Sequence, residues 1–369
     1  MPELRLSSGN GPVVRNVLDT PVRDALPHEV PVIDVSGIFS PDPSARQAVA
    51  QQIRSAALAN GFFYIKNHGI PSSITSTAAS SSLDFFRQPA ELKEPANTAR
   101  SAYKGMSGWK PPATQRINPF ESLDCRESFS WRYDPKYDPS VEDVSKIPPY
   151  VAQYITHDAD GFPWSKVTSP EHFKPAVIEL WQGVLGLGRA LLRSFALSLD
   201  QDEYAFDDKF THPDVGMAIN YYPPLPPSPV EKPVQEEVSI GSHTDFQLFT
   251  LLWQDPTPST LQVLSREGQW LYAQPVEGTF VVNFGDYMQR ITNDRYGSTV
   301  HRVKNKSGKE RLSMAFFFGF NQNETVEVLD SCVDKEKGEK KKYEGISCYE
   351  WMQRRVKMMH DTTGKVGGY

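Results

Sequence analysis

The chain has 369 residues, of which 39% are hydrophobic and 23% are charged, a composition ordinary for a globular protein. Its net charge is −6, and no cluster of Lys and Arg lies on an expected helix face, so the sequence does not indicate nucleic-acid binding. No apolar stretch approaches the length of a membrane span, and residues 1–10 lack the apolar core of a signal peptide.

Two further features bear on where the protein works. Cys125, Cys332 and Cys348 are odd in number and follow no disulfide or zinc-binding spacing, which predicts free thiols in a reducing compartment. The basic run at residues 335–342 is interrupted by Glu336 and Glu339, which is typical of a solvated surface loop. We therefore expect a cytoplasmic protein, a monomer or weak homodimer, with no nucleic-acid or membrane partner.

The first part of the chain predicts an irregular arm followed by alternating strands and helices. Residues 1–29 are polar and irregular, and residues 89–163 predict proline-bearing loops rich in Trp and Tyr. Ser44 is the expected N-cap of the first helix, and Gly61 is expected to end that helix. The expected elements are a strand over Val30–Val35, a helix over Ala45–Asn60, a strand over Phe62–Lys66 and a helix over Pro71–Phe86.

The second part predicts one long helix followed by many strands. The helix is expected to begin at Ser169-Pro170, with Pro at its first position, and to carry an apolar stripe as far as Leu199. Short strands with turn residues between them then predict a sandwich or barrel, before a final helix over Ser347–His360. The expected strands are Val215–Tyr222, Val238–Thr244, Leu248–Gln254, Leu261–Leu264, Trp270–Gln274, Thr279–Asn283, Ser298–Val303, Leu312–Phe320 and Val326–Leu329.

Three residues in the strand-rich part form a candidate metal site. His243 and Asp245 are two positions apart, so an extended segment places both on one face, and His301 follows in another expected strand. Two imidazoles and one carboxylate are the ligand set of non-haem Fe(II) oxygenases. Arg311 and Ser313, ten and twelve residues after His301, suit a carboxylate at the open face of the metal. A His-x-Asp pair is frequent by chance, and most histidines in proteins are solvated or buried in the core. The pattern alone therefore leaves open both a metal site and ordinary histidines without a ligand role.

Ordered matches along most of the chain strengthen the metal-site interpretation. The chain resembles the isopenicillin N synthase-like group of Fe(II)- and 2-oxoglutarate-dependent dioxygenases, and the resemblance is weakest over residues 100–163 and 223–237. The matching segments are Pro31-Val32-Ile33-Asp34, Gly61-Phe62-Phe63-Tyr64, Asn67-His68-Gly69-Ile70, Asn220-Tyr221-Tyr222-Pro223, Gly241-Ser242-His243-Thr244-Asp245, Leu251-Leu252-Trp253, Val282-Asn283-Phe284-Gly285-Asp286 and His301-Arg302-Val303.

The resemblance implies an α+β fold with a double-stranded β-helix (jelly-roll) core and flanking helices. It divides the chain into an N-terminal arm at 1–29, a helical region with specificity loops at 30–200, the jelly-roll core at 201–330, and a C-terminal loop and helix at 331–369. It also implies an oxidoreductase that uses Fe(II), 2-oxoglutarate and O2. The expected reaction is oxidation of an unactivated C–H bond of a small molecule by hydroxylation, desaturation or oxidative cyclisation, in secondary metabolism.

The same resemblance assigns roles to individual residues. His243, Asp245 and His301 would bind Fe(II). Arg311, Ser313, Tyr222 and Asn220 would hold or brace 2-oxoglutarate. Phe246, Phe316 and Phe318 are expected to contact the substrate.

Two alternatives remain open from the sequence. The first is an isopenicillin N synthase-type oxidase, in which the Arg-x-Ser pair grips the carboxylate of the substrate and 2-oxoglutarate is not used. The second is a non-catalytic barrel that binds a small molecule. Measuring the uptake of Fe(II) and the consumption of 2-oxoglutarate distinguishes these two alternatives from a 2-oxoglutarate-dependent oxygenase.

Overall fold

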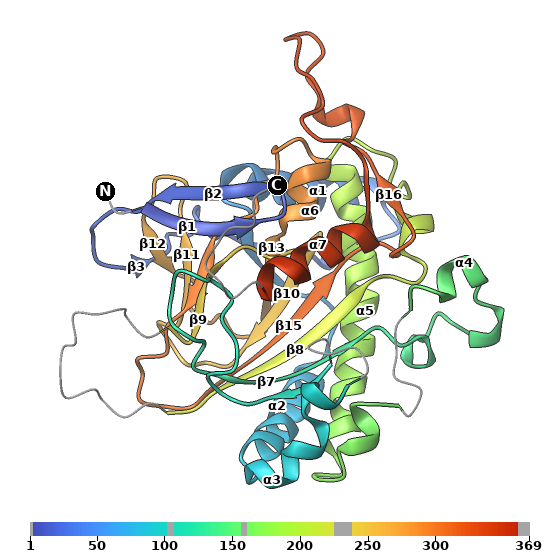
Figure 1. Cartoon of the computed structure of the whole chain (residues 1–369). Coiled ribbons are helices and arrows are strands. Elements are labelled where there is room, and N and C mark those ends of the chain that lie inside the picture. The colour runs from blue at the N-terminus through green and yellow to red at the C-terminus, as the bar shows by residue number, and fades with distance from the viewer. Residues whose placement is uncertain (1–2, 102–106, 156–160, 225–237, 361–369) are drawn as a thin grey trace.

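Two β-sheets form the centre of the molecule, with helices over the outer face of the larger one (Figure 1). The computed structural model describes residues 3–101, 107–155, 161–224 and 238–360. In this part of the chain the larger sheet has eight strands and the smaller five, an α+β architecture that confirms the expected jelly-roll core with flanking helices. The larger sheet runs in the order β4 (Val32–Asp34), β5 (Phe62–Lys66), β13 (Thr279–Phe284), β10 (Phe249–Gln254), β15 (Arg311–Phe318), β8 (Val215–Tyr222), β7 (Glu127–Arg132) and β6 (Gly108–Lys110).

The smaller sheet closes over the larger one. Its order is β3 (Arg23–Asp24), β12 (Trp270–Tyr272), β11 (Leu261–Leu264), β14 (His301–Val303) and β9 (Ile240–His243). Apolar side chains of both sheets pack together between them, where burial of each large apolar side chain contributes about 1.5–3 kcal/mol. This inter-sheet cluster includes Phe62, Tyr222, Ile240, Leu261 and Val303.

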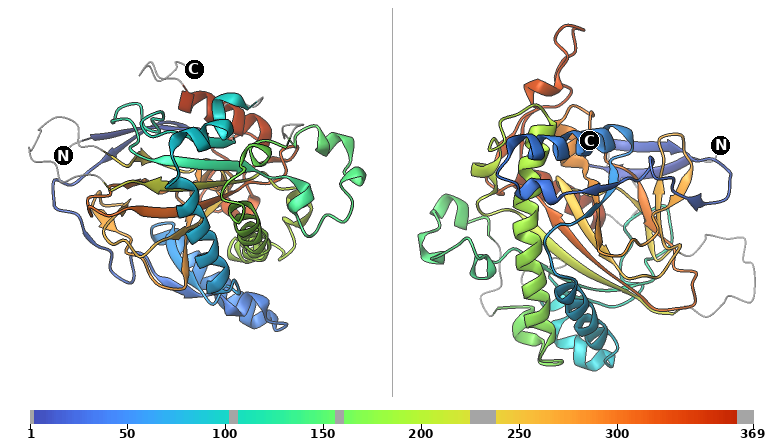
Figure 2. Two further views of the ribbon diagram at one scale, coloured as in Figure 1. Left: turned by 90° about the horizontal axis from the view of Figure 1, so that it is seen from below. Right: turned by 180° about the vertical axis from the view of Figure 1, so that it is seen from behind.

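Helix α5 (Phe173–Ser198) runs along the outer face of the larger sheet, and α1 (Pro43–Ala59) and α2 (Ser72–Phe86) pack against it (Figure 2). The expected apolar stripe is fully buried there, and Phe195 meets the rings of Phe249 and Phe284 edge-on. Gly188 permits the close approach, because a Cβ at that position would overlap the Phe318 ring. The other helices described are α3 (Ala90–Lys93), α4 (Pro149–Ala152), α6 (Asp286–Ile291) and α7 (Cys348–His360).

Two expected helix starts are wrong. α1 begins at Pro43, and its N-cap is Asp42, whose carboxylate accepts a hydrogen bond from the backbone N–H of Ser44 at 2.9 Å. The side chain of Asp42 therefore satisfies a free N–H of the first turn, the role expected of Ser44. α5 begins three residues after Pro170, at Phe173, because residues 170–173 form a turn closed by a hydrogen bond from Phe173 N to Pro170 O.

Two regions expected to be irregular contain strands. In the N-terminal arm, β1 (Glu3–Ser8) and β2 (Gly11–Asn16) form a hairpin, and Leu6 packs with Leu264, Trp270 and Val300. Within residues 89–163, β7 and β6 extend the larger sheet beyond β8. β7 alternates buried aromatic residues with serines, a period-two pattern that the surrounding prolines obscured.

The N-terminal and C-terminal parts of the chain contribute to one continuous sheet. β4, β5, β6 and β7 come from the expected region 30–200, and they pair with strands from the expected core at 201–330. The division expected near residue 200 stays a prediction; that residue lies in the connection between α5 and β8. No helix of the described residues is long and apolar enough to cross a membrane.

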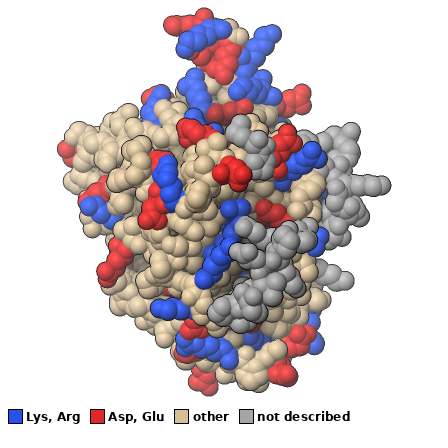
Figure 3. Space-filling model, turned by 90° about the vertical axis from the view of Figure 1, so that its left-hand side faces the viewer, with Lys and Arg blue, Asp and Glu red and all other residues tan. Residues whose placement is uncertain are grey.

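The basic run lies on a projection between β16 (Thr325–Val326) and β17 (Ile346–Ser347), at the top of Figure 1. Its Lys side chains stand beside acidic ones on the surface (Figure 3). Lys341 pairs with Glu327 and Asp330, and Lys342 pairs with Asp294. These exposed pairs fit the expected solvated loop.

Candidate metal centre

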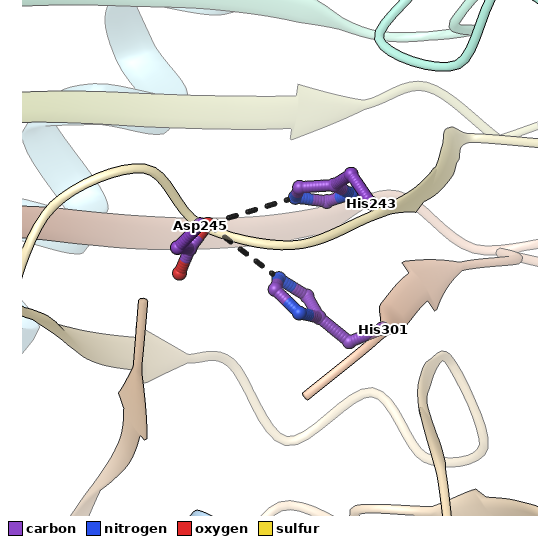
Figure 4. A group of neighbouring side chains, drawn as sticks. All are labelled: His243, Asp245 and His301. Atoms are coloured by element: carbon purple, nitrogen blue, oxygen red, sulfur yellow. Dashed lines mark ion pairs between the residues drawn. The ribbon is translucent and has the colours of Figure 1, made fainter. Parts of the chain in front are cut away.

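Strand pairing brings the two distant histidines together. β9 and β14 are antiparallel and place His243 directly opposite His301, with imidazole centroids 4.2 Å apart. Asp245 lies two residues beyond the end of β9, and its Oδ1 lies 3.8 Å from Nε2 of each histidine (Figure 4). One ligand atom from each residue lies within 4.8 Å of the others, so the three atoms can share one metal ion.

Backbone carbonyls orient both imidazoles. The Nδ1 atom of His243 lies 2.7 Å from the carbonyl oxygen of Gly241, and that of His301 lies 3.1 Å from the carbonyl oxygen of Thr299. Because a carbonyl oxygen can only accept a hydrogen bond, the hydrogen is assigned to Nδ1 in each ring. The lone pair of each Nε2 then points toward Asp245, ready to bind a metal.

The carboxylate of Asp245 is held in a complementary way. Its Oδ2 accepts hydrogen bonds from Thr250 Oγ1 at 2.5 Å and Asn283 Nδ2 at 2.7 Å, which leaves Oδ1 for the metal. Burial raises the pKa of Asp245, but the two imidazoles and these two donors outweigh burial and lower it. Burial, and next the neighbouring imidazole of His301, lower the pKa of His243. A neutral imidazole and a carboxylate are the forms that bind a divalent metal.

A buried guanidinium lies on the sheet beside this cluster. Arg311 begins β15, is fully buried, and packs against the ring of Tyr222 at 4.8 Å on the neighbouring strand β8. It donates to Ser313 Oγ at 3.4 Å and to Gln254 Oε1 at 3.1 Å, while its Nε has no hydrogen-bond partner among the described residues. No described carboxylate lies within ion-pair distance of Arg311. A buried charge without a counter-ion is costly, so the arrangement suits an anionic ligand.

One cavity of about 230 Å³ contains the metal cluster and this guanidinium. It lies between the two sheets and is closed on one side by Met352 and Val356 of α7. A wider depression of about 600 Å³ on the surface near Arg189 and His212 contains none of the expected site residues. The expected residues that line the smaller cavity are Tyr222, Asn220, His243, Asp245, Phe246, His301, Arg311 and Ser313.

The structure separates the three aromatic residues expected to contact the substrate. Phe246 lines the cavity, with the Arg355 guanidinium over its ring at 4.1 Å. Phe316 and Phe318 do not line the cavity, because their side chains are fully buried on the opposite face of β15 in the core against α5. The period of a strand places Phe317, half-buried and cavity-lining, on the same face as Arg311 and Ser313. Phe317 therefore replaces Phe316 and Phe318 as the aromatic wall residue of β15.

Sequence reasoning missed several other residues of the site. Gln254 holds Arg311 and Thr250 holds Asp245, whereas Asn283, which also holds Asp245, stood within a matching motif. Lys110 and Arg126 line the cavity from β6 and the residue before β7, in the region where the resemblance was weakest. The alternation in β7 was the one available signal for the second pair, since Ser128 and Ser130 point to the cavity opposite buried Phe129 and Trp131.

Comparison with known proteins identifies the family. The model of the 2OG-Fe(II) oxygenase superfamily matches residues 213–320, and that of the N-terminal region of the non-haem dioxygenase in morphine synthesis matches residues 30–150. A 2-oxoglutarate-Fe(II) type oxidoreductase of Metarhizium majus is 50% identical over 98% of this chain and 96% of its own length. The chain belongs to the 2OG-Fe(II) oxygenase superfamily. This oxygenase is also 31% identical to a homoarginine-6-hydroxylase of Arabidopsis thaliana, over 84% of the chain and 90% of that protein.

Solved structures agree with this family. The crystal structure of a full-length Neurospora crassa protein in complex with alpha-KG and thymine superposes with a TM-score of 0.71 at 26% identity, covering 89% of this chain and 96% of that one. The oxygenase is therefore an enzyme of the class that uses Fe(II), 2-oxoglutarate and O2, and its cavity contains a His-Asp-His cluster with the donor set that Fe(II) requires.

Proposed function

We propose that His243, Asp245 and His301 bind Fe(II), and that Arg311, Ser313 and Tyr222 bind the distal carboxylate of 2-oxoglutarate. The enzyme oxidises an unactivated C–H bond of a small molecule in secondary metabolism, by hydroxylation, desaturation or oxidative cyclisation. The observation that carries this proposal is the buried Arg311 guanidinium, which lines the same cavity as three converging metal-ligand atoms and lacks a described carboxylate partner.

The donor set supports Fe(II) rather than a structural zinc ion. Two neutral nitrogen donors and one carboxylate leave coordination positions open, whereas structural zinc prefers a closed set rich in thiolates. Fe(II) bound there supplies the oxidising chemistry, in which O2 converts 2-oxoglutarate to succinate and CO2 and, in hydroxylation, gives one oxygen atom to the substrate. The protein holds the ligand atoms through Gly241, Thr299, Thr250 and Asn283.

The strand pair β8 and β15 supports the binding of a carboxylate. Arg311 and Tyr222 are cross-strand partners, as are Ser313 and Asn220, so four polar side chains stand in two adjacent rows of the sheet. A guanidinium can grip a carboxylate with two parallel hydrogen bonds, and the hydroxyls of Ser313 and Tyr222, 3.5 Å apart, stand beside it. We propose that Asn220 braces this end of the site, because it pairs with Ser313 across the sheet and its Oδ1 accepts a hydrogen bond from Arg126.

Apolar side chains of both sheets enclose the reaction space. Phe62, Leu252, Leu261 and Val303 line the cavity around the metal cluster, and the Phe62 ring lies 5.4 Å from that of His301. A dry lining strengthens the electrostatic contacts within the site and shields a reactive centre from water.

The proposal extends to the setting of the enzyme. Cys125, Cys332 and Cys348 form no disulfide bond in the described structure, which supports a reducing compartment such as the cytoplasm. We propose a monomer or weak homodimer that acts without a nucleic-acid or membrane partner; size-exclusion chromatography with light scattering tests the oligomeric state.

Metal-ligand variants test the proposed centre. Equilibrium dialysis should show one Fe(II) bound per wild-type chain, and His243→Ala, Asp245→Ala or His301→Ala should lose both this iron and the release of succinate from 2-oxoglutarate. Circular dichroism should show an intact fold, because the sheets are held by their apolar packing rather than by one ion. Thr244→Ser, a change between two ligands, serves as the matched control. A variant that lacks one ligand yet keeps full iron and activity would disprove the site.

A further inference from the structure

A second cationic cluster lies at the other end of the cavity. Lys110 stands in a row of cross-strand partners that runs from Ser313 through Asn220 and Ser128 to Lys110. Neighbouring strands lie about 4.8 Å apart, so Lys110 is about 14 Å along this row from Ser313. Arg126, the residue before β7, also lines the cavity and reaches Asn220 in the same row. Lys110 is therefore well separated from the Arg311 site, and Arg126 lies between the two.

The described structure gives these two cations one acidic partner between them, because Asp124 forms an ion pair with Arg126 and no ion pair forms at Lys110. Lys110 lines the cavity and has no hydrogen bond or ion pair among the described residues. Arg126 donates to two neutral amides, Asn220 Oδ1 and Gln115 Oε1, while its Nε is buried without a partner. The nearest carboxylate is Asp124, 3.6 Å from Arg126, and it also accepts a hydrogen bond from the Gly241 N–H.

The charge balance favours one additional negative charge. Two cations face the single carboxylate of Asp124, so one positive charge is left over in a partly buried place. Burial, and next the proximity of Arg126, lower the pKa of Lys110 to about 8, while Asp124 acts in the opposite direction. Holding this lysine between the sheets without a partner opposes folding, and a bound monoanion would remove the opposition.

The surface between the two ends is shaped for a ligand. Ser128 lines the cavity between Ser313 and Lys110, and small residues line it in the adjoining rows of the same sheet: Ser130, Ala218, Ala315 and Gly216. Small side chains leave room above the sheet, and the serine hydroxyls offer hydrogen bonds along it.

We propose that Lys110 and Arg126 form a subsite for a carboxylate of the substrate, so that the enzyme acts on carboxylate-bearing small molecules. This proposal rests on the proposed function, because it takes the Arg311 end to be filled by 2-oxoglutarate. The carboxylate anchors one end of the substrate about two strand spacings from Asn220, and the C–H bond to be oxidised points back toward the metal cluster. Lys110 and Arg126 are thus specificity-determining residues rather than catalytic ones.

Chemical labelling of Lys110 provides the test. Full-length enzyme loaded with Mn(II) and saturating 2-oxoglutarate is treated with a limiting amount of acetic anhydride near pH 8, and acetylation of each lysine is measured by mass spectrometry. Acetate, benzoate and 3-phenylpropanoate are added as probes, each beside its neutral amide. We expect at least one acid to slow the acetylation of Lys110 in a saturable way, while its amide does not. Lys66, exposed at the end of β5, is the internal control and should not respond.

A variant and a second measurement complete the test. Arg126→Gln should weaken the protection of Lys110 by about tenfold in acid concentration, which corresponds to about 1.4 kcal/mol. If none of the three acids protects Lys110, or if acids and amides protect it equally, the proposed subsite is wrong. This outcome is measured on the wild-type enzyme, so it does not depend on whether Arg126→Gln folds. Calorimetric titration of 2-oxoglutarate into Mn(II)-loaded enzyme prepared without 2-oxoglutarate separates this result from the proposed function. Loss of 2-oxoglutarate binding would refute the proposed function, whereas protection of Lys110 reports on the subsite alone.

Discussion

The two faces of β15 share one backbone and the same neighbouring strands, yet they have opposite roles. Arg311, Ser313, Ala315 and Phe317 face the cavity, where two of them are polar and one is only half-buried. Leu312, Met314, Phe316 and Phe318 face α5 and are fully buried. The comparison shows that chemistry and stability occupy alternate positions of one strand, so a shift of one residue exchanges a binding side chain for a core side chain.

The largest expected effect on stability comes from the core face. Phe316→Ala should lower the free energy of unfolding by about 3–5 kcal/mol, because it leaves a cavity in a tightly packed core. Phe317→Ala, the adjacent change on the cavity face, should cost less than about 1.5 kcal/mol, because the ring is already partly exposed. Chemical denaturation of both variants measures the difference. Equal losses of unfolding free energy in the two variants would contradict the assignment of Phe316 to the core face and Phe317 to the cavity face of β15.

A smaller effect is expected at Lys110, and it has the opposite sign. The pKa of Lys110 is lowered from 10.5 to about 8, so between these values the folded protein binds fewer protons than the unfolded chain. Its destabilising contribution is therefore fully present below about pH 8 and is relieved as the pH rises toward 10.5. Because the side chain also meets cavity water, we expect Lys110→Met to stabilise the ligand-free protein at pH 7 by on the order of 1 kcal/mol.

Thermal unfolding from pH 7 to 10 measures this effect. The advantage of Lys110→Met over wild type should be largest at pH 7 and should shrink above pH 8. Lys66→Met, at an exposed position, should show no such advantage. A destabilised Lys110→Met protein would mean that this lysine stabilises the fold. Lys110 would then resemble the core-facing side chains rather than the binding side chains of the cavity.

The sequence predicts the candidate metal site better than the cavity wall, for physical reasons. His243, Asp245, His301 and Arg311 stand in short motifs whose spacing is set by strand geometry, and the structure brings them into one cavity. Residues 312–318 are almost entirely apolar, so hydrophobicity alone could not tell the two faces of β15 apart, and Phe316 was assigned to the wrong one.

Long-range pairing explains what the sequence could not reveal. Lys110 and Arg126 reach the cavity only because β6 and β7 add to the edge of the larger sheet next to β8, about ninety residues later in the chain. The hairpin of β1 and β2 is likewise held by apolar contacts of Leu6 with residues beyond 260. Local patterns carry no information about partners at such distances.

The most direct test of the central claim is the affinity for 2-oxoglutarate when Arg311 is changed. Calorimetric titration of 2-oxoglutarate into Mn(II)-loaded protein should show a dissociation constant raised at least about thirtyfold in Arg311→Leu, from a loss of roughly 2–5 kcal/mol, with Mn(II) still bound. Arg311→Lys should recover only part of this affinity, because an ammonium cannot make the two-pronged contact. Lys110→Met, at the other end of the cavity, should bind 2-oxoglutarate as the wild type does. An unchanged affinity in Arg311→Leu would contradict the assignment, and a wild-type protein that binds no 2-oxoglutarate would favour an oxidase of the isopenicillin N synthase type, in which this arginine holds the substrate.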